Sequence, residues 1–164
     1  MQLARVMLLV VLAGFAVVFA GTATSASPVP KHLQKEGDSE QAKFQGKWKV
    51  HSIKVGGMEI GATGIDMHLE FRGDTFTAIA NDQTTTAKVK FDVVDGVKRM
   101  TTTESQTISR DGNPIRTSRD ESVGYTLDGD KLTVATTQDQ KPIDPVKADK
   151  DAIVMVLIRV KDEK

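Results

Sequence analysis

The sequence predicts an all-β protein, an eight-stranded antiparallel up-and-down barrel, from two observations. Short runs rich in Thr and Val recur along residues 44–161 and are separated by pairs of turn-forming residues. The pairs are Gly56-Gly57, Gly73-Asp74, Asn81-Asp82, Asp95-Gly96, Asp111-Gly112 and Asp128-Gly129. Within several runs apolar and polar residues alternate, which is typical of a sheet with one buried face and one solvated face.

Eight strands are expected, each a β-branched or alternating run that ends at a turn pair or a longer connection. In chain order they cover residues 44–55, 66–72, 75–80, 84–94, 97–108, 115–127, 131–137 and 152–161. Most connections have hairpin length, so strands adjacent in sequence should be adjacent in the sheet. Closure of the sheet into a barrel would remove its exposed edges.

Three strands show the alternation most clearly. The apolar positions that share one face are Met67, Leu69 and Phe71 in the second strand, Ala87, Val89, Phe91 and Val93 in the fourth, and Val123, Tyr125 and Leu127 in the sixth. The last strand is apolar on both faces. It is therefore expected to lie centrally in the sheet and to be covered on its outer side, by the N-terminal segment or by a partner.

Two connections are longer than hairpin turns. Residues 56–65 are rich in glycine, whereas residues 138–151 contain two prolines and four aspartates. Both are expected to be loops, because neither has a run of alternating apolar residues.

The N-terminal region has the features of a secretory signal peptide. Arg5 precedes an uncharged apolar stretch over residues 6–20, and small residues follow, with Thr24 and Ala26 placed for signal peptidase. We expect residues 1–26 to be the signal peptide, 27–43 a linker or short helical lead-in, and 44–164 the barrel domain. The protein should then be exported, to the periplasm or the extracellular space; an uncleaved N-terminal anchor is the alternative.

The balance of charged side chains limits which classes of binding partner are expected. The 164 residues carry 22 basic and 22 acidic side chains, and removal of Arg5 with the leader would leave a formal charge of about −1. Nucleic acids and anionic membranes both reward a basic excess, so neither is expected as a partner, and the cleaved protein should not associate strongly with membranes. There is no cysteine, so the fold depends on its apolar core rather than on disulfides.

The first and last strands carry a resemblance to a known family. Gly46, Lys47 and Trp48 begin the first strand, and Arg159 stands near the end of the last. This arrangement resembles the G-x-W signature of lipocalins. The resemblance implies that Trp48 plugs the closed end of the barrel, next to Gly46, and that Arg159 stacks across the indole as a cation–π pair.

Four ordered segments extend the resemblance to small secreted bacterial lipocalin-like domains of the calycin type. They read FQGKWKVHSIKVGG, RGDTFTA, GYTLDGDKLTVA and VMVLIRVK, and span residue 44 to about residue 161. Members of this group mostly have no assigned activity, so the resemblance implies a lipocalin-like fold and leaves function open. The midway T-D-Y-like phrase and the helix after the seventh strand of well-studied lipocalins are not evident here.

Motifs for catalysis or metal binding are weak. The three histidines show no ligand spacing, the aspartates of residues 138–151 match no calcium loop, and neither G-x-S-x-G nor S-x-x-K occurs. The Arg72-Gly73-Asp74 tripeptide is expected to serve as a hairpin turn. We therefore predict no enzymatic activity, no cofactor and no metal. A carboxylate pair of Glu104 and Glu121 is the weakest alternative.

The inward-facing residues have two interpretations, because eight strands enclose a space that side chains just fill or that holds one small ligand. The predicted lining residues are Met67, Leu69, Phe71, Val89, Phe91, Tyr125 and Leu127. The leading hypothesis is a barrel that binds a small, mainly apolar molecule. The alternative is a protein-interaction or cell-envelope module with a filled barrel.

Overall fold

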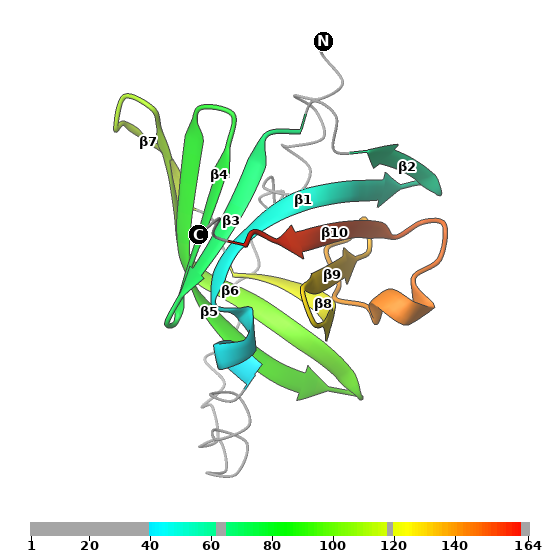
Figure 1. Ribbon diagram of the computed structural model, residues 1–164. Helices are drawn as coiled ribbons and strands as arrows, with labels where there is room; N and C mark the ends of the chain where they lie inside the picture. Colours follow the sequence, from blue (N-terminus) through cyan, green and yellow to red (C-terminus); the bar gives the residue numbers. More distant parts are fainter. Residues whose placement is uncertain (1–39, 62–64, 118–119, 162–164) are drawn as a thin grey trace, which may run out of the picture.

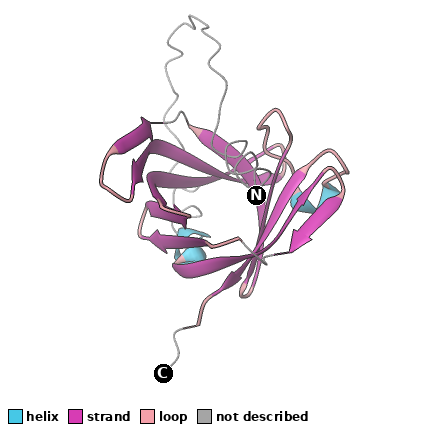
Figure 2. Cartoon of the chain, turned by 90° about the horizontal axis from the view of Figure 1, so that it is seen from above, coloured by secondary structure: helices cyan, strands magenta, loops and turns pink. Residues whose placement is uncertain are grey.

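A computed structural model describes residues 40–61, 65–117 and 120–161, and these form a closed antiparallel β-barrel (Figure 1). The eight barrel strands are β1 (Gly46–Val55), β3 (Met67–Arg72), β4 (Thr75–Ala80), β5 (Gln83–Val94), β6 (Val97–Ser109), β8 (Glu121–Asp128), β9 (Lys131–Thr136) and β10 (Ile153–Arg159). Each pairs with the next in this order, and β10 pairs with β1 to close the ring, which Figure 2 shows from above. The predicted fold class is confirmed. The predicted signal peptide lies outside the described residues.

Two further short strands differ from the expected pattern. The glycine-rich connection contains β2 (Met58–Gly61), which returns along β1 as a hairpin. Gly56 and Gly57 have φ of 60° and 77°, the left-handed backbone that a tight hairpin turn requires and that glycine adopts without strain. The expectation of a loop over residues 56–65 was therefore wrong for residues 58–61.

The run at residues 115–127 is also not one strand. Its first part is β7 (Pro114–Thr117), which pairs with the C-terminal end of β6, and its second part is β8, which pairs with β6 at Arg99–Thr102. Between these two contacts β6 contains a β-bulge, where Glu104 has a φ of 54°. A bulge bends a strand and interrupts its ladder, which accounts for the division.

One edge of β1 changes partner along its length. Its first residues, Gly46–Lys49, pair with β3, whereas Ser52–Val55 pair with β2. The other edge pairs with β10 from Trp48 to Val55. The barrel is therefore continuous at the end where β1 begins, and at the opposite end the β1–β2 hairpin extends beyond the contact with β3 (Figure 1).

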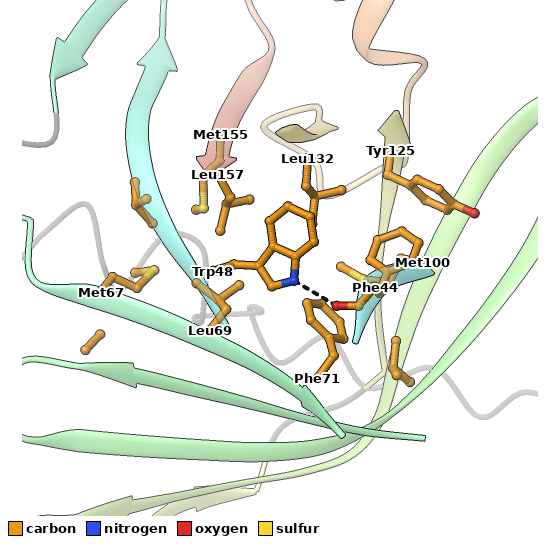
Figure 3. Packing of buried hydrophobic residues seen from close by; sticks show 13 residues of the cluster. Phe44, Trp48, Met67, Leu69, Phe71, Met100, Tyr125, Leu132, Met155 and Leu157 are labelled. Carbon is orange, nitrogen blue, oxygen red and sulfur yellow. Dashed lines mark hydrogen bonds between the residues drawn. The ribbon is translucent and has the colours of Figure 1, made fainter. Parts of the chain in front are cut away.

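The end where β1 begins is closed by a plug. Residues 40–44 form a short helical turn, and it places Phe44, which is fully buried, inside the barrel. Trp48 is also fully buried, and its Nε1–H donates a hydrogen bond to the carbonyl oxygen of Phe44 at 2.8 Å (Figure 3). The indole and the plug are thus fixed to one another, with no polar atom of the indole left unpaired.

The connection from β9 to β10 folds over the outside of the barrel. It contains the 3-10 helix η1 (Pro145–Lys147), and the backbone of Ile143 lies directly against Gly124 of β8. β10 is central, as expected, and among the described residues Ile158 on its outer face is 38% exposed; the N-terminal segment expected to cover it lies outside the described residues. The connection covers β8 and β9, because only the absent side chain of Gly124 leaves room for its backbone.

Candidate ligand-binding site in the barrel

The structure brings all seven predicted lining residues together inside the barrel. Five of them are buried members of one hydrophobic cluster, and the other two are partly buried against it. The buried five are Met67, Leu69, Phe71, Val89 and Tyr125; the partly buried two are Phe91 and Leu127. The alternation of apolar residues therefore identified the inner face of their strands correctly.

The three aromatic residues of this set fill the closed end and do not line an open space. The ring of Phe44 lies 5.5 Å from that of Phe71, 4.4 Å from that of Phe91 and 5.0 Å from that of Tyr125, between centroids. Tilted and edge-on contacts at these distances are favourable aromatic packing. Together with Trp48 they make the plugged end a solid core.

Arg159 seals the same end from the last strand. Its guanidinium carbon lies 4.2 Å from the centre of the Trp48 ring, so the cation stacks on the indole. The guanidinium also donates hydrogen bonds to the carbonyl oxygens of Lys43, at 2.7 Å, and Gln45, and its Nε pairs with Asp130 at 3.1 Å. Arg159 therefore joins the helical turn to the barrel.

Gly46, the first residue of β1, suits this closure by its backbone conformation. Its φ is 108°, in a region that side chains rarely adopt. Space is not the restriction, because an added Cβ would lie 3.5 Å from Nη1 of Arg159, an ordinary van der Waals contact.

A polar cluster holds the other side of the plug. Glu40 accepts hydrogen bonds from Lys43 at 2.8 Å, from Lys98 at 3.3 Å and from the hydroxyl of Tyr125 at 3.1 Å. Burial raises the pKa of the Glu40 carboxyl, but the bonds from Lys43 and Lys98 outweigh it, so the pKa lies below its ordinary value. Burial, and then the charge of Glu40, raise the pKa of Tyr125.

The opposite half of the barrel has small residues on its inner face. They are Ala78, Ala80, Thr85, Ala87, Ser105 and Thr107, and all are buried except Ala78, which is partly buried. Strand register places them side by side: Ala78 is opposite Thr85, and Thr85 is opposite Thr107. The hydroxyls of Thr85 and Thr107 are hydrogen-bonded at 2.9 Å.

Sequence analysis identified only part of this small-residue group: Ala87 was assigned to the apolar face of its strand, but none of the six was among the predicted lining residues. Thr85 and Ala87 share the alternation of Val89, so their inner position was available from the pattern. Ser105 and Thr107 were not, because the bulge at Glu104 reverses the alternation: even-numbered Met100 faces inward before it and odd-numbered Ser105 and Thr107 after it.

The tripeptide and the possible metal ligands considered in the sequence analysis form no functional site among the described residues. Arg72-Gly73-Asp74 forms the β3–β4 turn, with Arg72 paired to Glu70 and Asp74 to Lys88, both at 2.8 Å. Among residues 40–61, 65–117 and 120–161 no group of three or more His, Asp or Glu side chains is arranged to hold a metal ion.

The two carboxylates of the weakest alternative do not form a pair on one face. Glu121 is paired with Thr102, which lies two residues from Met100 and so shares its inward face. Glu104 instead lines a shallow depression on the outer surface, with Lys88 and Gln106. The bulge separates the two faces, so the geometry gives this alternative no support.

Comparison with known proteins identifies no relative. No family model, curated protein or solved structure matches the chain. In the part of the chain that the structure describes, no helix is both long enough and apolar enough to cross a bilayer.

Proposed function

We propose that the protein is an exported lipocalin-like domain that binds one small, mainly apolar molecule in the half of the barrel away from Trp48. The observation that carries this proposal is the change in side-chain size along the barrel axis. Aromatic rings and leucines occupy the plugged end, whereas alanine, threonine and serine face the interior at the other end.

Eight strands enclose an interior that large side chains just fill, as they do at the plugged end. Small side chains on the inner face of the other half would therefore leave volume for a ligand. The buried side chains that adjoin this region, Met67 and Met155, are flexible and adapt readily to a ligand's shape. Burial of the ligand's apolar surface would supply the affinity, about 25 cal/mol per Å².

One observation favours the alternative of a protein-interaction module. Ile79 and Ile108 lie on either side of Thr84 on the outer surface of β4, β5 and β6, and are 49% and 36% exposed. Exposed apolar residues that cluster on a sheet are typical of interaction sites. This surface is separate from the barrel interior, so the two functions are tested independently.

The ligand proposal is tested with N-phenyl-1-naphthylamine, a neutral apolar dye whose fluorescence rises on transfer out of water. Fluorescence of Trp48 is a poor reporter, since that residue is sealed in the plugged end. We expect saturable binding of one dye per protein. Ala78→Phe should abolish it by filling the space opposite Leu69 and Thr85, without loss of stability.

Ile79→Phe is the matched control, because it adds a ring on the outer face of the same strand and should leave dye binding unchanged. Absence of saturable binding by the wild-type protein would refute the proposal. So would a large loss of stability in Ala78→Phe with the control unaffected, because it would mean that the space is already filled.

A further inference from the structure

The two sides of the ligand-binding half differ in chemistry. One side consists of β10 and β1, where Ile153 is opposite Val55 and Met155 is opposite Ile53 on the inner face. β2 continues this face, with Met58 opposite Val55 and Ile60 opposite Ile53. This group of six residues is called the apolar wall below, and each of its members is an aliphatic or thioether side chain.

The apolar wall extends past the rim of the barrel. Met58 and Ile60 are 72% and 38% exposed, although register places them on the same face as the partly buried Ile53. In a hairpin that only extended the barrel, the concave face at the mouth would be expected to be polar. Exposed apolar residues there are suited to contact with a ligand that fills the barrel up to its mouth.

The other side of the same half consists of β5 and β6. Its inner face carries Ala87 and three hydroxyl-bearing residues, Thr85, Ser105 and Thr107, which are called the hydroxyl wall below. A threonine hydroxyl offers one donor and two acceptor positions. The single bond between Thr85 and Thr107 therefore leaves both able to bond to a ligand.

The two walls face one another across the barrel. In the ring order β1, β3, β4, β5, β6, β8, β9, β10, the strand four places from β1 is β6, and the strand four places from β10 is β5. Figure 2 shows the ring from above, with strands on opposite sides of the interior. A bound molecule would meet aliphatic side chains on one face and hydroxyls on the other.

From this opposition we propose that the ligand is a rigid facial amphiphile, a fused-ring or flat molecule with hydroxyl or carbonyl groups along one face and hydrocarbon on the other. The inference rests on the proposed function and specifies its ligand class. A flexible acyl chain has no such faces, and it would lose more conformational freedom on binding than a rigid ring system.

The test uses two non-ionic cholamide surfactants below their micelle concentrations, BIGCHAP and deoxy-BIGCHAP, which differ by one hydroxyl on the polar face. Displacement of N-phenyl-1-naphthylamine from the full chain gives their affinities. The isosteric double variant Thr85→Val/Thr107→Val removes both members of the hydrogen-bonded pair and leaves neither unpaired. The dye affinity of each variant is measured first, so that displacement gives true surfactant affinities. We expect the double variant to weaken BIGCHAP about 5- to 10-fold and deoxy-BIGCHAP less.

Thr84→Val is the control, because Thr84 lies on the outer face between Ile79 and Ile108. Saturable dye binding together with equal surfactant affinities in wild type and double variant would overturn the facial inference and leave the proposed function intact. Failure of the wild-type protein to bind the dye would overturn both. Binding of both surfactants much more weakly than oleate would overturn the inference in favour of a flexible chain.

Discussion

The guanidinium of Arg159 stacks on the indole of Trp48 at 4.2 Å and joins the last strand of the barrel to the first. The two residues are directly paired in the β1–β10 ladder, so the ladder that closes the ring also sets this contact. The hydrogen bonds from Arg159 to the carbonyl oxygens of Lys43 and Gln45 extend the contact to the plug. One side chain therefore links the ladder that closes the ring to the plugged end.

Arg159→Ala should lower the free energy of unfolding by about 2–3 kcal/mol. The variant loses the cation–π contact and leaves the exposed carbonyl oxygen of Lys43 and the partly buried one of Gln45 without their charged donor. Urea unfolding measures the effect. Arg110→Ala is the control, because Arg110 is highly exposed and makes one ion pair, at 3.4 Å, so it should change stability by less than about 0.5 kcal/mol. Equal effects of the two variants would contradict this account of Arg159.

Trp48→Ala should lower the free energy of unfolding by about 3–5 kcal/mol, the range for truncation of a fully buried aromatic side chain. It also removes the donor to the carbonyl oxygen of Phe44. Denaturant unfolding followed by circular dichroism is suitable, since the variant has no tryptophan left to report by fluorescence. A change well under 1 kcal/mol would show that Trp48 does not fill the closed end.

Tyr125 is the only tyrosine in the chain, so tyrosinate absorbance in the near ultraviolet reports on it alone. Burial and the Glu40 carboxylate raise its pKa above the ordinary value of 10.0, which favours the neutral phenol in the folded state. Its stabilising contribution is therefore complete below pH 10 and is lost as the pH rises further. We expect tyrosinate to appear only together with unfolding.

Glu40→Gln is the matched variant for this titration. Because it removes the negative charge beside the phenol, Tyr125 should ionise at lower pH than in the wild-type protein. Ionisation of the Tyr125 phenol with the ordinary tyrosine pKa of 10.0, in wild-type protein that is still folded, would contradict the structure.

The same variant should alter the acid dependence of stability. The pKa of Glu40 lies below its ordinary value of 4.5 in the folded protein, so its contribution is present above that pH and is lost as the pH falls through the folded-state pKa. Urea unfolding at several pH values should show wild type more stable than Glu40→Gln at neutral pH and the two converging in acid. A constant difference at all pH values would refute this role for the carboxylate.

The barrel was predictable from sequence because its evidence is local. Turn pairs such as Asn81-Asp82 and strict alternation such as Met67, Leu69 and Phe71 specify hairpins and an inner face without knowledge of distant contacts. The position of Phe44 inside the barrel, in contrast, could not be predicted from the sequence. It depends on Glu40, Lys98 and Arg159, which are far apart in the chain and meet only when the ring closes.

The candidate site was only partly predictable for a related reason. Sequence alternation led to the large apolar residues, and the three aromatic ones among them pack around Phe44 at the closed end. The small residues of the other half carry little hydrophobic signal, and a single left-handed residue, Glu104, shifts two of them, Ser105 and Thr107, out of phase. Glycine or asparagine at this position would have indicated a left-handed backbone and hence a bulge, but the residue is a glutamate.

Gly124→Ala should detach the β9–β10 connection from the barrel wall. An added Cβ would lie 1.8 Å from the carbonyl oxygen of Ile143, which is backbone and cannot rotate away, so the whole connection must move. We expect a loss of about 1–3 kcal/mol in urea unfolding, and faster tryptic cleavage at Lys147 and Lys150 because the segment leaves its packed position. Gly61→Ala is the control: Gly61 lies in β2 with nothing within 4 Å of an added Cβ. If the two substitutions had the same effect on stability and cleavage, Ile143 could not be packed against β8 as the structure describes.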